Sequence, residues 1–342
     1  MKATTARAPQ PAATIRQTLD NYQRPVMAKS LWQLVNTVIP YGILGYLAFR
    51  ALAHSFWLAL PVLILMSGFL VRIFIIFHDC GHGSFFRSKK LNNLLGRITG
   101  LLTFTPYHYW RSSHARHHAT SGNLDKRGQG DVWMMTRQEY LDASRMDRLK
   151  YRLYRNPFIM FVLGPLAVIL INNRLPTKGI NRSERNSILL TNLAVALYSL
   201  GMIWLMGLQA FLLMQLTVLF FAHVAGVWLF YVQHQFEGVY WKRGKEWDFL
   251  SAALEGGSFY RLPAIIRWFT GSIGYHHLHH LNSRIPNYHL VPCQKQVPQL
   301  QRVKTIGLRA SLKSLNYRLW DEDSGRLIGF GELRRNRGLA PG

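Results

Sequence analysis

The apolar residues of this chain are gathered into long blocks, which basic and histidine-rich stretches separate. A helix needs about 20 apolar residues to cross the hydrocarbon core of a bilayer. Four blocks reach that length, at about 31–53, 56–77, 188–206 and 210–232. A fifth, 158–171, is too short, and we expect an interfacial helix there. The pattern therefore predicts an all-α integral membrane protein with four transmembrane helices.

The positions of Lys and Arg between these blocks predict the orientation of the chain. The short links 53–55 and 207–209 carry neither residue, whereas 172–187 carries four of them and the N-terminal segment 1–28 is basic. Lys and Arg accumulate in cytoplasmic segments of membrane proteins. We therefore expect the four helices to form two hairpins in the plasma (bacterial inner) membrane, with both termini in the cytoplasm.

The excess of positive charge has two physical explanations. The chain contains 41 Lys and Arg against 16 Asp and Glu, a net charge of +25. Such a charge suits binding to nucleic acid or to anionic lipid headgroups. No nucleic-acid-binding module occurs, and long apolar blocks are foreign to such proteins, so the membrane explanation is favoured. The two cysteines form no CxxC pair, which favours a reducing environment over a disulfide framework.

Three short patterns contain most of the 14 histidines. They are His78-Asp79-Cys80-Gly81-His82, His114-Ala115-Arg116-His117-His118 and His276-His277-Leu278-His279-His280. Residues three and four apart share one face of a helix, so each pattern directs two or three imidazoles to one point. His277 falls off that face. Eight candidate metal ligands remain: His78, His82, His114, His117, His118, His276, His279 and His280.

The three patterns can share one metal site only if they lie on one side of the membrane. An even number of crossings must then separate the second pattern from the third. Three apolar blocks occupy that interval, so one of them does not cross, and 158–171 is the shortest. We expect segments 78–157 and 233–342 to form a cytosolic helical cap that carries the histidines. Residues 29–342 would form a single membrane domain, preceded by the cytosolic segment 1–28.

The number and type of ligands restrict the metal. Eight imidazoles exceed the four ligands of a tetrahedral zinc, which implies at least two metal ions. The sequence contains neither the ExxH motif of soluble di-iron bundles nor the HExxH motif of zinc proteases. An all-nitrogen dinuclear site with open positions for dioxygen fits iron best. A metal transporter would place its histidines at the bilayer midplane, whereas these lie outside the apolar blocks.

The three patterns, in this order and at these distances from the apolar blocks, resemble the histidine boxes of membrane fatty-acid desaturases. The resemblance also includes the stretches GNLDKRGQGDVW (122–133), FYVQHQFEGVYW (230–241) and GYHHLHHLNSRIPNY (274–288), and the triplet Glu246-Trp247-Asp248. It covers roughly residues 30 to 325. Within the family, the chain is similar to bacterial acyl-lipid desaturases of the Bacillus Δ5 type, which act on phospholipid acyl chains.

This resemblance implies a centre of two iron ions that uses dioxygen to place a cis double bond in an acyl chain. It also implies a further ligand between the second and third patterns, a position that His234 fits, just past the last apolar block. His223 lies 11 residues earlier, about 16 Å along a helix, which is too far for a ligand. The expected substrate is a phospholipid or another fatty acyl compound.

A metal-bound imidazole usually donates the N–H of its other ring nitrogen to a carboxylate or a carbonyl group. Five carboxylates close to the histidines in sequence are candidates for this role: Asp79, Asp125, Asp131, Glu237 and Asp248.

The reaction also needs electrons from a separate protein. The chain has no HPGG haem motif, no GxGxxG motif and no cysteine set for an iron–sulfur cluster. A ferredoxin or flavodoxin is the expected donor, because an acidic protein would suit a basic docking face. A hydroxylase or alkane-type monooxygenase, which resembles the same histidine pattern, remains the alternative within this chemistry.

Overall fold

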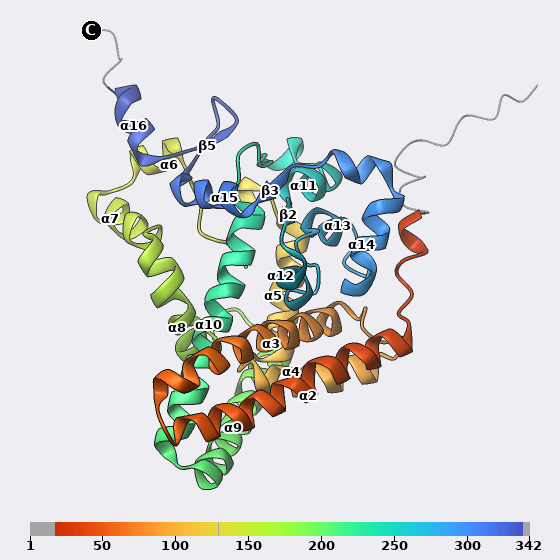
Figure 1. Ribbon diagram of the computed structural model, residues 1–342. Helices are drawn as coiled ribbons and strands as arrows, with labels where there is room; N and C mark the ends of the chain where they lie inside the picture. The colour runs from red at the N-terminus through yellow and green to blue at the C-terminus, as the bar shows by residue number, and fades with distance from the viewer. Residues whose placement is uncertain (1–17, 129, 338–342) are drawn as a thin grey trace, which may run out of the picture.

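Long helices gather at one end of the molecule, and most of the short helices lie at the other (Figure 1). The computed structural model describes residues 18–128 and 130–337. The long helices are α2 (Met27–Leu52), α3 (Phe56–His82), α9 (Arg182–Met206) and α10 (Leu208–His234). Helix α2 packs against α3, α9 packs against α10, and α10 also packs against α3. The tight connections α2–α3 and α9–α10 both lie at the lower left of Figure 1. They lie away from the short helices α11 (Phe249–Gly256), α13 (His276–Leu281) and α14 (Asn287–Gln296).

Three helices of the described chain, α3, α9 and α10, are long and apolar enough to cross a membrane. Helix α2 is long enough, but it is not among them, which differs from the expectation for 31–53. The reason is that polar and small residues interrupt its aliphatic ones, including Gln33, Asn36 and Thr37. The side chains of Gln33 and Thr37 are buried against protein.

The short apolar block forms a helix from Ile159 to Asn172, close to the expected 158–171. Two π-helical turns, Ile159–Leu163 and Val168–Asn172, flank the short helix α8 (Gly164–Ala167). This segment follows α7 (Arg145–Tyr154) at a bend of 62°, and the two together are apolar enough for a broken span or a re-entrant loop. The block is therefore the second half of a bent pair of helices.

The outer surface of α9 is apolar. Leu190, Leu197 and Trp204 are 67%, 61% and 85% exposed, respectively. Large apolar side chains in a row on one helix suit contact with lipid chains rather than with water. The buried core extends from the long helices into the region of short helices. Leu70 of α3 and Val218 of α10 belong to the same buried cluster as Trp241, which lies beyond the end of α10. This continuity fixes the short helices relative to the long ones.

The remaining elements are short. The helices are α4 (Lys89–Leu102), α5 (Tyr107–Thr120), α6 (Arg137–Asp142), α11 (Phe249–Gly256), α12 (Ala264–Phe269), α13 (His276–Leu281), α14 (Asn287–Gln296), α15 (Leu308–Ser311) and α16 (Phe330–Arg337). Single 3₁₀ turns occur at Leu124–Lys126, Gly244–Glu246, Pro298–Arg302 and Leu312–Asn316.

Within residues 18–128 and 130–337, five short strands occur that were not part of the all-α expectation. Strand β4 (Leu319–Asp321) pairs in parallel with β1 (Met135–Thr136) and antiparallel with β5 (Arg326–Ile328). Strand β2 (Phe259–Arg261) pairs in parallel with β3 (Thr305–Gly307). Both sheets join segments far apart in sequence, so they fix the C-terminal region to the helices that carry the histidines.

Candidate metal centre and acyl cavity

Two groups of four histidines lie where α3, α5, α10 and α13 converge. In each group, one ring nitrogen of every residue lies within 4.8 Å of the others. The first group is His78, His82, His114 and His279, and the second is His117, His234, His276 and His280. His118 lies between them: its Nε2 is 3.1 Å from Nε2 of His114, and its ring stacks on that of His280. The structure thus brings together all nine histidines predicted as ligands.

Local helix geometry explains how the first pattern presents its rings. Helix α3 begins at a Ser55 cap and continues past the apolar block, so that His78 and His82 share a face of its last turn. It ends there because Gly83 adopts φ = 70°, a left-handed conformation that favours glycine. His234 is the last residue of α10, and so lies inside the helix rather than just past it.

Glycine between the two histidines of the first pattern has a steric reason. A Cβ atom at Gly81 would lie 2.9 Å from the ring of Trp110. That ring stacks on His114, with centroids 4.4 Å apart and planes at 23°. Trp110 therefore sets the orientation of the His114 imidazole, and Gly81 provides the space for it. Sequence reasoning missed this role of Trp110.

Hydrogen bonds fix the tautomers of two rings in the second group. Nδ1 of His117 lies 2.5 Å from Oδ1 of Asp131, and Nδ1 of His234 lies 3.1 Å from the carbonyl oxygen of Gly256. A carbonyl oxygen or a carboxylate only accepts, so each Nδ1 carries the hydrogen. In the neutral form of each ring, Nε2 then carries a lone pair, and the two Nε2 atoms lie 3.1 Å apart. Two facing lone pairs repel each other unless a cation lies between them.

The spacing of the nitrogens also fits a metal. Two imidazole nitrogens bound to one metal at about 2.1 Å lie roughly 3.0–3.4 Å apart for ligand angles between octahedral and tetrahedral. Nε2 of His276 lies 3.1 Å from that of His280, within this range, and 2.8 Å from that of His234, slightly below it. In the first group, Nε2 of His78 lies 3.1 Å from that of His279.

His82 gives a further indication of a metal. Its Nε2 is buried and has no hydrogen-bond partner in the structure. Leaving a buried polar atom unpaired costs about 1–3 kcal/mol, so such an atom needs an explanation. A metal ion bound by the first group would supply the missing partner.

The rings outside the long helices are held neutral. Burial lowers the pKa of these imidazoles well below the ordinary 6.5, and the neighbouring histidines lower it further. This applies to His114, His118, His276, His279 and His280. A neutral imidazole is the form that binds a metal.

Asp79, one of the predicted carboxylates, contacts the histidines through a buried network. Its Oδ1 lies 3.2 Å from Nδ1 of His78, and its Oδ2 accepts from the backbone N–H and the side-chain amide of Asn287 at 2.7 and 2.8 Å. Asn287 and Gln33 exchange two amide hydrogen bonds, both 3.1 Å long. Sequence reasoning missed Asn287 and Gln33, although Asn287 lies in the stretch 274–288 that carried the resemblance.

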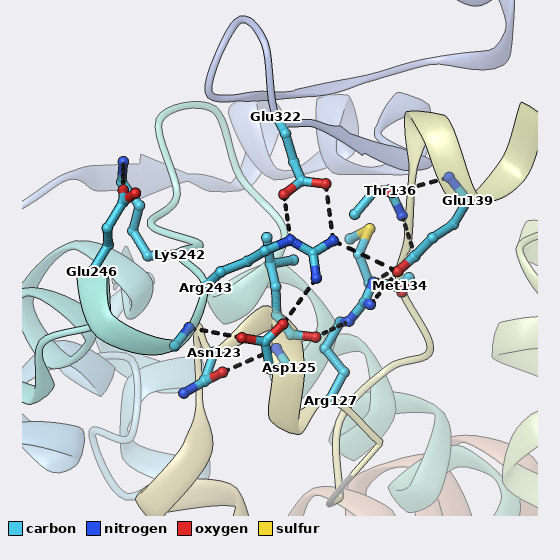
Figure 2. A network of polar contacts seen from close by, with 12 residues as sticks. Asn123, Asp125, Arg127, Met134, Thr136, Glu139, Lys242, Arg243, Glu246 and Glu322 are labelled. Carbon is cyan, nitrogen blue, oxygen red and sulfur yellow. Dashed lines mark hydrogen bonds and ion pairs between the residues drawn. The ribbon is translucent and has the colours of Figure 1, made fainter.

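Asp125 lies elsewhere, in an ion-pair network (Figure 2). Its carboxylate accepts from Arg243 at 2.8 Å and from the backbone N–H of Gly244 at 2.8 Å. Arg243 also binds Glu322, while Arg127 binds Glu139. The network joins three separate segments around the loop that leads to Asp131. Asp125 therefore stabilises this loop and does not contact a histidine, contrary to expectation.

The other two predicted carboxylates also lie away from the rings. Asp248 caps α11 by accepting from the N–H of Ser251 at 2.8 Å, and Glu237 is exposed in the turn after α10. His277, which was predicted to be off the ligand face, is fully buried and pairs with Gln294. It belongs to neither group of four.

A mostly apolar cavity of about 310 Å³ leads to the histidines. Phe74 and Leu70 of α3 line it together with Gly226 and Phe230 of α10. His78, His114 and His276 are part of its wall, so the cavity reaches both groups. His223 lines the cavity, but its Nδ1 bonds to the carbonyl oxygen of Leu219, and it is not part of either group.

Comparison with known proteins gives a consistent result. The sequence model described as fatty acid desaturase matches residues 55–305. A Bacillus subtilis protein named fatty acid desaturase is 50% identical over 313 residues, which are 92% of this chain and 89% of that protein. Two proteins named sn-1 acyl-lipid omega-3 desaturase (ferredoxin) are also similar. The one from Nostoc is 28% identical, over 80% of this chain and 76% of its own length. The one from Synechocystis is 32% identical, over 72% and 69%.

Proposed function

Because the chain belongs to the fatty acid desaturase family, a family of oxidoreductases, we propose that it introduces a cis double bond into the acyl chain of a phospholipid. The observation that carries the proposal is the position of the histidines. Nine imidazoles converge beside an apolar cavity. An acyl chain in that cavity would bring its methylenes next to the metal-binding nitrogens.

Two iron ions fit the histidines, one in each group of four, with His118 between them. Bound iron would supply the activation of dioxygen that removal of hydrogen from an unactivated methylene requires. The overall reaction balances when one dioxygen, two electrons and two protons accompany the loss of two hydrogens from the chain, giving a double bond and two waters. The imidazoles hold the metal, while Asp131 and Asp79 orient His117 and His78.

The protein selects the methylenes by geometry, because an acyl chain has no polar group near its middle. Phe74, Phe230 and Leu70 form the apolar wall of the cavity, which excludes water and positions the chain. Gly226 leaves that wall open, since a Cβ atom there would meet nothing within 4 Å. The position of the double bond would therefore depend on how far the acyl chain extends past Gly226.

The arrangement of helices supports two hairpins. The second and third histidine patterns meet in one site, so an even number of crossings separates them. Helices α9 and α10 supply two, which leaves the bent pair of α7 and Ile159–Asn172 as a re-entrant segment. Helices α2 and α3 form the other hairpin, in which the polar residues of α2 face protein. The basic segments would place the histidines and both termini on the cytoplasmic side.

A separate protein would supply the electrons. The names of the Nostoc and Synechocystis relatives include ferredoxin and an acyl lipid, which supports both a ferredoxin-type donor and a lipid substrate here. The net charge of +25 suits an acidic donor and an anionic membrane surface.

The test is the fatty-acid profile of a bacterial host that expresses the chain, with double-bond positions mapped by mass spectrometry. We expect a new monounsaturated isomer in the phospholipids, which a His114→Ala variant does not form. A hydroxylated product would favour a monooxygenase. An unchanged profile, with iron-loaded protein in the membrane and a ferredoxin present, would contradict the proposal.

A further inference from the structure

A second cavity, of about 700 Å³, lies between α4, α5 and the first turns of α9. One part of its wall is cationic or polar, with Arg97, His108 and Arg182. Another part is apolar, with Leu101, Leu190 and Ala194. None of the residues that line this cavity is acidic. We refer to it as the cationic pocket.

The two arginines of the cationic pocket are available for an anion. Arg97 lies 3.2 Å from Nε2 of His108, and within the described residues neither Arg97 nor Arg182 forms an ion pair with a carboxylate. The nearby Arg116 differs, because it pairs with Glu184 at 3.0 Å. Arginine matches the geometry of a phosphate group and binds it by two hydrogen bonds.

The apolar side of the cationic pocket continues onto surfaces that suit lipid. Leu94 and Ile98 of α4 are 57% and 51% exposed, and Leu190 of α9 is 67% exposed. Basic pockets at the cytoplasmic ends of transmembrane helices bind anionic lipid headgroups. Phosphate-binding groups beside exposed leucines therefore match one amphiphile, a phospholipid, better than a soluble anion.

One short segment separates the cationic pocket from the acyl cavity. Thr103 and Thr105 line the acyl cavity, whereas Leu101 and Tyr107 line the cationic pocket. The carbonyl oxygen of Phe104, between them, accepts from the side chains of Asn173 and Arg174, which hold the segment against the chain before α9. A phospholipid with its phosphate at Arg97 and Arg182 would have its acyl chains next to the acyl cavity.

We propose that the cationic pocket binds the phosphate of the phospholipid substrate. This inference rests on the proposed function, because it assigns a headgroup site to the same lipid whose chain is desaturated. It also assigns a role to Arg97 and Arg182, which are not among the nine predicted ligands.

The experiment compares Arg97→Gln/Arg182→Gln with Arg309→Gln/Lys313→Gln, a control that removes the same charge from two exposed positions outside both cavities. Binding of phosphatidylglycerol to the purified, iron-loaded protein is measured by native mass spectrometry, and inorganic phosphate is titrated separately. We expect the pocket variant to raise the Kd for phosphatidylglycerol on the order of 30-fold. The control should bind like wild type. Equal binding of the lipid and of inorganic phosphate by wild type would overturn the assignment to a lipid.

Steady-state kinetics on phosphatidylglycerol vesicles then test whether the bound lipid is the substrate. We expect the pocket variant to raise KM with kcat and iron content unchanged. An unchanged Kd, or a raised Kd with an unchanged KM, would overturn the headgroup assignment while wild type still desaturates phospholipid. If wild type instead acts only on acyl-CoA or acyl carrier protein, the phospholipid part of the proposed function fails first.

Discussion

Nε2 of His117 and Nε2 of His234 lie 3.1 Å apart, although both rings carry their hydrogen on Nδ1. The two residues are 117 positions apart in sequence and come from different helices, α5 and α10. When both rings are neutral, the two Nε2 lone pairs face each other, which is unfavourable without a cation between them. The contact therefore supports the second group of histidines as a candidate metal site.

His234→Ala should remove one ligand from the second group and lower both iron content and desaturation. We expect the second group to lose its iron, because only three of its four histidines would remain. The first group keeps all four of its histidines and should keep its iron. Iron per chain and product per chain measure the effect. His54→Ala is the control, since His54 is exposed in the α2–α3 connection. Full iron occupancy in His234→Ala would exclude His234 as a ligand.

Asp131→Ala should weaken iron binding on the order of 10–100-fold, because partners of metal-bound histidines contribute that much to affinity. Asp131→Asn keeps an acceptor oxygen for Nδ1 of His117 and should have a smaller effect. Competition with a chelator measures the affinity. Asp125→Ala, which loses contacts to Arg243 and Gly244 but none to a histidine, should weaken the affinity less than Asp131→Ala does. A larger loss of iron affinity in Asp125→Ala than in Asp131→Ala would contradict this role of Asp131.

Asn287→Leu should destabilise the protein by about 1–3 kcal/mol, because it leaves Oδ2 of Asp79 and the amide of Gln33 short of partners. The midpoint of thermal unfolding in detergent measures the change. The double variant Gln33→Leu/Asn287→Leu should be less destabilised than the sum of the two single variants, since both halves of the amide pair are then removed. Strict additivity would show that the pair does not interact.

Gly226→Phe should fill the acyl cavity without disturbing the helix, because a Cβ atom at Gly226 meets no atom within 4 Å. We expect activity on long acyl chains to fall on the order of 100-fold, or the double bond to move along the chain, with iron unchanged. Gly201→Phe is the matched control, since Gly201 is equally unobstructed but lies on the exposed face of α9. An equal loss of activity in both variants would contradict the proposed position of the acyl chain in the cavity.

The apolar blocks predicted the long helices well but not their ends. Block 56–77 stops at Phe77, whereas α3 continues to His82, because the polar histidine pattern is also helical. Helix α2 shows the opposite limit. Its length was predicted, but the burial of Gln33 against Asn287 depends on a segment about 250 residues away and cannot be read from local composition.

The positions of the candidate metal ligands were more predictable than their hydrogen-bond partners. Helical spacing directs the eight histidines of the three patterns to one face of each helix, whereas His234 was expected from the family resemblance. All nine lie together in the structure. Carboxylates near them in sequence had no such constraint: Asp79 and Asp131 contact histidines, whereas Asp125 pairs with Arg243. The partner of His234 is the carbonyl oxygen of Gly256, a backbone group that no residue type reveals. The paired strands were missed because they are two or three residues long and pair over long distances.

The most direct test of the account is the iron content of purified protein that is active in desaturation, measured by plasma mass spectrometry. With one metal in each group of histidines, we expect about two iron ions per chain. Iron content and activity should fall in parallel when a chelator removes the metal. Adding iron should restore the activity, whereas adding zinc should not. Active protein with no iron, or with full activity at less than one iron per chain, would contradict the central claim.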